Sequence, residues 1–363
     1  MKSRASNGTL TKSATIRDVA EFAGVSVATV SRVVNSTCVV RKQTSDAVFE
    51  AAKSLGFRPN LMGRNLRSTR TKTIGVMLPM LSHPVFAECL QGIETAAQKH
   101  NHVVAISTSG YRPESEERSS ELLLQQRVDG LILTVADASS SPVLDKLDAE
   151  GVPYVLVFNQ VVSGSGSLAR IRPSVCVDNR LASWDLVKYL IELGHDAIHM
   201  VAGQFSQSDR SQQRFAGYRD AMNDAGLVWR APLELPFNTT DTCAELLALL
   251  QSNNRPSAFF CSNDQLAMTV VRDLQLLGVR VPEDVSVVGF DGVQVGQWMN
   301  PALTTMTQPT ADIGRIAVEH LLQLIAGGPK GVPALLPHTL RQGGTAERFV
   351  SQVSPSNLKR KLQ

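Results

Sequence analysis

The chain has 363 residues, of which 43% are hydrophobic, and a formal net charge of +3. This length and apolar content suffice for two or three domains with buried cores. No apolar run approaches the roughly 18 to 20 residues that span a bilayer, and the N-terminal sequence MKSRASNGTLTKSATIRD lacks the apolar segment of a signal peptide. We therefore expect a cytoplasmic protein without a membrane span.

The sequence contains no pattern that indicates an enzyme, a metal site or a cofactor site. It has no G-x-S-x-G, no phosphate-binding loop and no H-E-x-x-H motif. The cysteines are far apart and form no C-x-x-C pair, which argues against a zinc site and a disulfide framework. We expect free thiols at Cys38, Cys89, Cys176, Cys243 and Cys261.

Positive charge is concentrated at the start of the chain. Residues 1–72 hold 13 Lys and Arg against 4 Asp and Glu, a net charge of +9, whereas the remainder has a net charge of −6. Phosphate neutralisation by such a basic segment supplies most of the sequence-independent affinity for nucleic acid. The charge alone would equally fit a solvated basic tail.

Two short helices are predicted directly after an N-terminal tail, residues 1–13, that we expect to be disordered. Thr15 and Asp18 have capping-box spacing at the start of the first helix, and Ser26 can cap a second helix that runs to about Asn35. A turn containing Gly24 separates them. This arrangement predicts a helix-turn-helix, whose second helix places its first side chains in the DNA major groove. A plain helical hairpin is the alternative, and the basic charge argues against it.

The rest of the basic segment predicts a third helix and a DNA-contacting hinge. Apolar residues on one face of residues 43–55 would close a three-helix domain over residues 14–58. Residues 59–72 then combine exposed leucines with arginines, which fits a hinge helix with a leucine wedged between base steps in the minor groove. The residues expected to contact DNA are Thr15, Ser26, Val27, Ala28, Thr29, Arg32, Asn35, Asn60 and Leu66.

These motifs resemble a known family. The sequences ATIRDVAEFAGVSVATVSRVVN and RPNLMGRNLR are similar to the lactose/galactose repressor family of bacterial transcription regulators, and the similarity extends from about Ala14 to about Leu340. The resemblance implies that Leu66 is the leucine that intercalates at the operator centre. It also implies that Val27, Ala28 and Arg32 read bases in the major groove.

The body, residues 73–340, predicts an α/β fold of two doubly wound parallel sheets. Short apolar, β-branched segments alternate with helical ones, as in a parallel sheet covered on both faces. We expect one lobe over about 73–160 and a second over about 161–291, with crossovers between about 292 and 340 and a C-terminal tail over 341–363. The second lobe would begin with the strand SVCVDN. The family resemblance implies the same fold, which is shared with periplasmic sugar-binding proteins.

The loop 161–173 is expected where the chain passes between the lobes. It carries Arg170 and Arg172, which would either overlook a cleft or lie in solvent, the second being the commoner situation for a loop. His195, in a Leu-Gly-His sequence that the family also has, is expected to be structural.

Two such lobes place a ligand cleft at the carboxyl ends of their strands. Asn159, Asn263 and Asp291 end predicted strands, and Arg214 starts a helix that follows one. Polar residues at strand ends are also common caps and turn formers, so only their joint pattern favours a ligand site. With the aromatic and basic residues nearby, the expected effector site comprises His83, Phe86, Asn159, Arg210, Arg214, Phe237, Asn263 and Asp291.

The family resemblance implies roles for several of these residues. Arg214, Asn263 and Asp291 would hydrogen-bond hydroxyl groups of an effector, Phe237 would pack on its apolar face, and His83 replaces a frequent asparagine. The sequences IGVMLPMLSHPVFAECLQGIE, GYRPESEERSSELL and GFDGVQVGQ look most like the gluconate and 2-ketogluconate repressors of the family. Arg210 beside Arg214 would suit a carboxylate.

We therefore expect a repressor that responds to a sugar acid. Because one helix-turn-helix reads only a few base pairs, the partner would be a palindromic double-stranded DNA operator bound by a homodimer, with a tetramer left open. A neutral sugar or a nucleobase remains possible as the effector. A solute-binding protein without a DNA role, or an α/β enzyme, is disfavoured by the basic head and by the missing phosphate-binding loop.

Overall fold

The computed structural model describes residues 14–35, 40–57, 70–160, 172–329, 331 and 333–349. The chain divides into two compact units, residues 1–70 and 71–363. Within the described part of the first unit lie the helices α1 (Ile16–Phe22), α2 (Val27–Asn35) and α3 (Lys42–Ser54).

The first unit is the predicted helix-turn-helix. The Thr15 side chain accepts a hydrogen bond from the Asp18 N–H, and the Thr15 N–H donates to the Asp18 carboxylate at 2.7 Å, which completes a capping box. Gly24 lies in the turn with φ +65°, a left-handed conformation that favours glycine. Val19, Val30 and Val48 are completely buried where the three helices meet.

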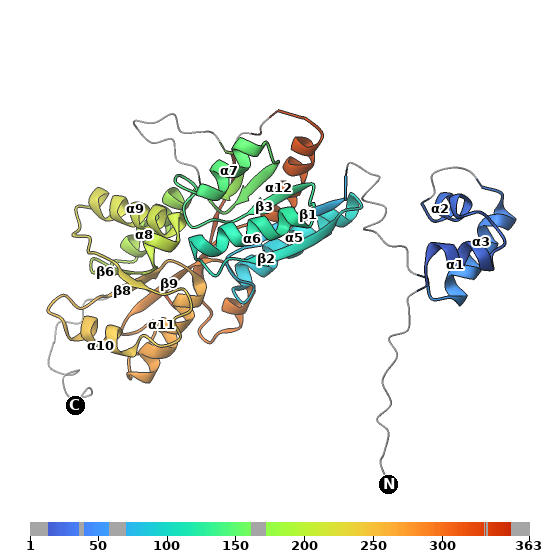
Figure 1. The fold of residues 1–363 in the computed structure, drawn as a ribbon. Coiled ribbons are helices and arrows are strands. Elements are labelled where there is room, and N and C mark those ends of the chain that lie inside the picture. The colour runs from blue at the N-terminus through green and yellow to red at the C-terminus, as the bar shows by residue number, and fades with distance from the viewer. Residues whose placement is uncertain are drawn as a thin grey trace, which may run out of the picture. The chain divides into compact units, whose positions relative to one another are not determined.

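The second unit contains two lobes, each built on a six-stranded sheet (Figure 1). The first sheet is parallel throughout, in the order β11-β5-β4-β3-β1-β2. Most of its strands are apolar and buried on both faces, which is the pattern of a parallel sheet covered by helices. Its elements are β1 (Thr73–Leu78), α5 (Pro84–Lys99), β2 (Val103–Thr108), α6 (Pro113–Gln125), β3 (Gly130–Leu133), α7 (Pro142–Glu150), β4 (Tyr154–Val157), β5 (Ser174–Val177), α12 (Thr310–Ile325) and β11 (Ala334–Leu336).

The second sheet has the order β12-β10-β9-β8-β6-β7, with β12 antiparallel to β10 at one edge. Helices α8 and α9 pack against each other, and α11 packs on β9. Its elements are α8 (Asn179–Glu192), β6 (Ile198–Gly203), η1 (Phe205–Gln207), α9 (Asp209–Asp224), β7 (Leu233–Leu235), α10 (Cys243–Gln251), β8 (Ala258–Cys261), α11 (Asp264–Leu276), β9 (Ser286–Asp291), η2 (Gln294–Trp298), β10 (Thr304–Thr307) and β12 (Thr339–Arg341).

The predicted boundary between the lobes is wrong by one strand. SVCVDN was expected to open the second lobe, but its strand β5 pairs with β4 in the first sheet. The chain first crosses between the lobes after Val177, so residues 161–173 connect two strands of one sheet. The two later crossings, from β10 to α12 and from β11 to β12, fall in the predicted region. The apolar strand itself carries no information about which sheet it joins.

Arg172 occupies neither of the two positions expected for it. Its side chain is buried and donates to the Ala138 carbonyl oxygen at 2.5 Å and to Asp145 at 2.6 Å. Its Nε lies 3.5 Å from Asp148. Arg172 therefore braces the loop between β3 and α7 from inside the first lobe. Arg170 lies outside the described residues.

The predicted C-terminal tail begins too early, because residues 341–349 belong to the second lobe. Thr345 is completely buried, and its hydroxyl donates to the Val287 carbonyl oxygen at 2.7 Å. The two ring nitrogens of His195 lie within hydrogen-bond distance of the Ser257 hydroxyl and the Glu347 carbonyl oxygen, and its ring stacks on Phe349. His195 is therefore a packing residue, as expected.

Candidate functional site

The first two turns of α2 present small side chains and one long donor to solvent. Val27 is 42% exposed, and Ala28 and Arg32 are exposed, whereas Thr29 is half-buried. The Ser26 hydroxyl accepts from the Thr29 N–H at 3.1 Å and lies 2.8 Å from the Thr29 hydroxyl, so both hydroxyls take part in starting the helix. Asn60, Leu66 and the side chain of Asn35 lie outside the described residues.

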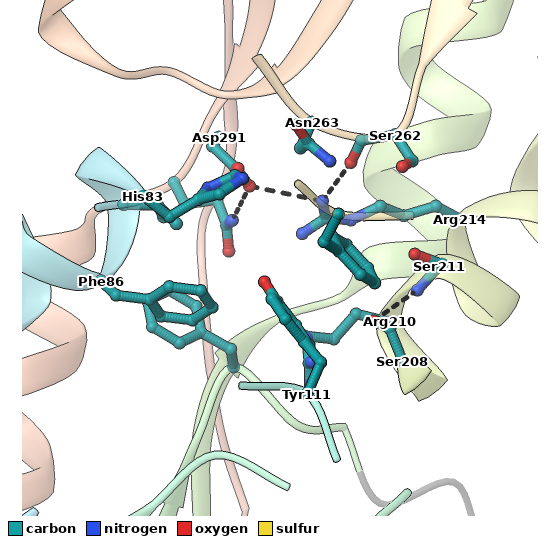
Figure 2. A pocket seen from close by; sticks show the side chains of 14 residues that line it. His83, Phe86, Tyr111, Ser208, Arg210, Ser211, Arg214, Ser262, Asn263 and Asp291 are labelled. Atoms are coloured by element: carbon teal, nitrogen blue, oxygen red, sulfur yellow. Dashed lines mark hydrogen bonds and ion pairs between the residues drawn. The ribbon is translucent and has the colours of Figure 1, made fainter. Parts of the chain in front are cut away.

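A pocket lies in the second unit at the carboxyl ends of strands from both sheets (Figure 2). All of the predicted effector residues except Asn159 line it. It is therefore formed by side chains that are far apart in the sequence, as the strand-end argument predicts. Its lining residues are His83, Val85, Phe86, Tyr111, Phe158, Ser208, Arg210, Ser211, Arg214, Phe237, Ser262, Asn263, Asp291 and Gln308.

Asn159 was predicted to belong to the effector site, but it does not line the pocket. Its side chain is completely buried and is hydrogen-bonded to the backbone of Val135 and to the carboxylate of Asp209. Its amide group therefore already has its partners and faces the contact between the lobes. A strand end in the middle of the sheet can point its side chain along the loops as well as into the cleft.

Several lining residues are not among those predicted from the sequence. Tyr111 follows β2, Ser262 follows β8 and Gln308 follows β10, so the same strand-end rule would have found them. Ser208 and Ser211 lie at the start of α9, where the Ser208 hydroxyl accepts from the Ser211 N–H at 3.3 Å. Their signal in the sequence is the capping serine before the helix that carries Arg214.

Arg214 is held by groups from three directions. Its Nε donates to the Asn179 side chain at 2.9 Å, and its Nη1 donates to the Ser262 carbonyl oxygen and to Asp291, the latter at 3.3 Å. The guanidinium carbon lies 3.7 Å from the centre of the Phe290 ring, a cation–π contact. Arg214 is thus buried with its geometry fixed before any ligand contacts it (Figure 2).

Asp291 faces Arg214 across the pocket and accepts a hydrogen bond from Gln308 Nε2 at 2.7 Å. Burial raises the pKa of Asp291 to about 6, and the positive charge of Arg214 opposes that rise. The residue adopts φ +117°, which is rare for a side chain other than glycine and is common at functional sites. Asp291 therefore changes its charge just below neutral pH.

Only some of the hydrogen-bond donors of Arg210 have partners among the described residues. Its Nη1 donates to the Val135 carbonyl oxygen at 3.0 Å and to Asp209 at 3.2 Å. Its Nη2 has no hydrogen-bond partner among the described residues, although the side chain is buried. Asn263 also leaves its side-chain NH2 group without a partner, because only its Oδ1 is used, in capping α11.

His83 is a neutral polar group in the pocket wall. Burial, with a smaller effect of Arg214, lowers the pKa of His83 to about 4. Neither ring nitrogen has a hydrogen-bond partner among the described residues. A neutral imidazole offers one donor and one acceptor, so His83 can bind a hydroxyl group.

Aromatic rings from both lobes meet at the centre of the pocket. Tyr111, from the first lobe, stacks on Phe237, from the second, with centroids 4.0 Å apart and an angle of 8° between the rings. Phe237 lies directly against Gly203, where a Cβ atom would come within 2.2 Å of the ring. The free volume beside this stack is about 30 Å³, far below the roughly 300 Å³ or more of a typical small-molecule site. A ligand of sugar size therefore requires the pocket to widen.

A helix-turn-helix head and a two-lobed body with a polar pocket at the carboxyl ends of both sheets define a ligand-responsive DNA-binding regulator. Two family models match the chain. Residues 15–60 match "Bacterial regulatory proteins, lacI family", and residues 71–352 match "Periplasmic binding proteins and sugar binding domain of LacI family". The chain belongs to the LacI family of bacterial transcription regulators.

Similar proteins are repressors and related regulators. The HTH-type transcriptional repressor PurR of Vibrio cholerae serotype O1 is 32% identical, over 86% of this chain and 91% of the relative. Catabolite control protein A of Priestia megaterium is 33% identical, over 85% and 91%. The solved lac repressor dimer bound to operator and the anti-inducer ONPF has a TM-score of 0.82 and 28% identity, over 93% of this chain and 100% of that one.

These comparisons confirm the fold and the general function. The chain is a DNA-binding, ligand-responsive transcriptional repressor and not an enzyme. Its predicted place among gluconate repressors is not supported, since the relatives carry names such as PurR, catabolite control protein A and ribose operon repressor. Within the described residues, no helix is long and apolar enough to cross a membrane.

Proposed function

We propose that the protein binds a palindromic operator as a homodimer and that its effector is a sugar acid, such as gluconate or 2-ketogluconate. The observation that carries the effector proposal is the set of unused donors in the pocket. Arg210 Nη2 and Asn263 Nδ2 are buried N–H groups that have no hydrogen-bond partner within the described part of the chain. A carboxylate accepts hydrogen bonds from such groups, and the cationic donor makes the bond stronger.

A neutral sugar is the second candidate, because the charges of the pocket are balanced. Arg214 is paired with Asp291, and Arg210 is paired with Asp209. One solved relative is the complex of the regulator CelR with cellobiose, and another relative is a ribose operon repressor. The parallel rings of Tyr111 and Phe237 would also suit a flat nucleobase inserted between them.

Calorimetric titration distinguishes these ligands. We expect gluconate or 2-ketogluconate to bind more tightly than glucose, ribose or a nucleobase. Arg210→Ala should lower the affinity for the acid roughly 10- to 100-fold, because it removes a charge-assisted hydrogen bond. Arg219→Ala, at an exposed arginine of the same helix, is the matched control and should change nothing. Tighter binding of a neutral ligand, or an unchanged acid affinity in Arg210→Ala, would refute the carboxylate model.

The pH dependence of binding gives a second, independent test. Asp291 has a pKa of about 6, and a ligand carboxylate beside it would favour its protonated form. Acid binding should therefore take up protons, and the affinity should rise as the pH falls from 8 to 6, by at most about tenfold per pH unit for one proton. His83 stays neutral over this range.

Titrations in buffers of different ionisation enthalpy measure this proton uptake directly. A neutral sugar would need Asp291 ionised as its acceptor, so its affinity should fall as the pH approaches 6. Proton release on acid binding would contradict the proposed role of the carboxylate. The variant Asp291→Asn should remove the part of the pH dependence that comes from this carboxyl, for either class of ligand.

Base reading by the head is proposed for Arg32, the one long donor among the exposed side chains of the first turns of α2. Arg32→Ala should relax selectivity at one position of each half-site, at a cost of about 1 to 3 kcal/mol per contact. Val27 and Ala28 should favour contacts with thymine methyl groups. Selection of binding sites from random DNA measures both effects, and an unchanged preference in Arg32→Ala would remove Arg32 from the readers.

The body offers an apolar edge for a second copy. β2 is the outermost strand of the first sheet, and its Val103 and Ile106 are 60% and 46% exposed. Leu122 on the neighbouring helix α6 is 46% exposed. Apolar side chains exposed along an open edge strand are typical of a protein–protein contact, which supports the proposed dimer.

A further inference from the structure

Asp209 links the two lobes beside the pocket through its carboxylate and its backbone N–H. This residue begins α9 in the second lobe, and it is 8% exposed. Its Oδ2 accepts from the Ala138 N–H at 3.1 Å and from Asn159 Nδ2 at 2.8 Å, both in the first lobe. Its own N–H donates to the Ala136 carbonyl oxygen at 2.8 Å. Its hydrogen bonds therefore cross the boundary between the lobes in both directions.

The backbone groups of the first lobe that bind Asp209 belong to the loop 135–138, which is held in place by hydrogen bonds within that lobe. Glu116 accepts from the Ala136 N–H at 2.7 Å, and Arg172 donates to the Ala138 carbonyl oxygen. Asn159 binds both the N–H and the carbonyl oxygen of Val135. The loop backbone is thus fixed from inside its own lobe, and the groups that face Asp209 are fixed with it.

Arg210 connects this contact to the pocket. Its Nη1 spans from Asp209 to the Val135 carbonyl oxygen of the opposite lobe. Arg210 also lines the pocket, and its Nη2 has no partner among the residues that the structure describes. The direction of that free N–H edge is therefore set by the same contact that holds the lobes together. A ligand that binds Nη2 necessarily acts on a group that bridges the lobes.

We propose that Asp209 is the positioning residue of a cross-lobe latch, formed with Asn159 and residues 135–138, that sets the angle between the lobes and aims Arg210 at the effector. In the latched geometry both carboxylate oxygens accept two hydrogen bonds each, from Ala138, Asn159 and Arg210. An effector changes the lobe angle by strengthening or breaking the Arg210 bond to Val135. The latch does not depend on whether the effector is an acid or a neutral sugar.

Amide hydrogen exchange of the full-length protein without added ligand tests the latch. Asp209→Asn keeps the size of the side chain but turns an NH2 group toward donors, whichever way it is oriented. We expect the Ala138 amide and the amide of residue 209 to exchange at least tenfold faster, while the amides of β3 and β8 inside the lobes keep their protection. Asp220→Asn is the matched control, since Asp220 lies on the same helix and pairs with Arg180 within one lobe.

Asn159→Asp breaks the same contact from the opposite side, by placing two carboxylates together. The exchanged pair, Asp209→Asn with Asn159→Asp, restores one donor and one acceptor across the boundary. Its latch amides should exchange more slowly than those of Asn159→Asp alone. Unchanged exchange at residues 138 and 209 in both single variants would overturn the proposal. The proposal would also be overturned if the increase in exchange rate in the exchanged pair equalled the product of the increases in the two single variants. Neither outcome bears on the identity of the effector.

Discussion

Arg214→Ala is expected to abolish effector binding and to destabilise the body at the same time. The substitution removes the donor to Asn179 and the Ser262 carbonyl oxygen, and it leaves Asp291 buried without its cation. Breaking a buried ion pair from one side costs about 3 to 5 kcal/mol of the free energy of unfolding. The unpaired carboxyl should respond with a pKa above its present value of about 6.

Chemical denaturation measures the loss of stability, and calorimetry measures the loss of effector affinity. Arg180→Ala is the matched control, because Arg180 is 56% exposed and pairs with Asp220 at the surface, where an ion pair contributes about 1 kcal/mol or less. Arg214→Lys keeps the positive charge but loses the planar set of guanidinium N–H donors. This variant should therefore retain most of the folding stability and lose most of the affinity for the effector. Normal effector affinity in Arg214→Lys would show that the guanidinium does not contact the ligand.

Leu66→Ala should weaken specific operator binding by about a hundredfold, while nonspecific DNA binding and folding stay nearly unchanged. The proposed role of Leu66, which lies outside the described residues, is to wedge apart a base step, and only an apolar inserter can hold that unstacked step open. Nonspecific binding depends on phosphate neutralisation by the basic residues, which the substitution leaves in place.

Thermal melting of the Leu66→Ala protein without DNA separates the wedge from its alternative. A leucine buried in a folded core would cost about 2 to 5 kcal/mol of stability when truncated. A lowered melting temperature with an unchanged preference for operator over nonspecific DNA would therefore make Leu66 a packing residue. Met62→Ala, in the same segment, controls for the loss of any apolar group near the DNA.

Much of the fold could be predicted because its signals are local. The helices that begin at Pro84, Pro113 and Pro142 are marked by a proline that tolerates the first turn, and the buried strands are short apolar runs. Neither signal reports which sheet a strand joins, so β5 was placed in the wrong lobe. The segment around Thr345 packs through one buried hydroxyl and has no periodicity, so its sequence does not distinguish it from a tail.

The pocket could be predicted to the extent that strand ends converge in a parallel sheet. His83, Phe86, Arg210, Arg214, Phe237, Asn263 and Asp291 all line it. The prediction for Asn159 was wrong because the direction of a side chain after a strand depends on the conformation of the neighbouring loops, which the sequence does not reveal. The pairing of Arg214 with Asp291 could not be predicted either, because the two residues lie 77 positions apart in the sequence.

Selection of operators from random DNA, followed by titration of each candidate effector on the selected site, tests most directly that this chain is an effector-controlled repressor that reads DNA as a dimer. We expect a palindromic consensus bound by two copies of the chain. We also expect that gluconate or 2-ketogluconate changes the affinity of the wild-type protein for that site, and that this change is lost in Arg214→Lys. An asymmetric or absent consensus, or an affinity that no acid, neutral sugar or nucleobase alters, would contradict it.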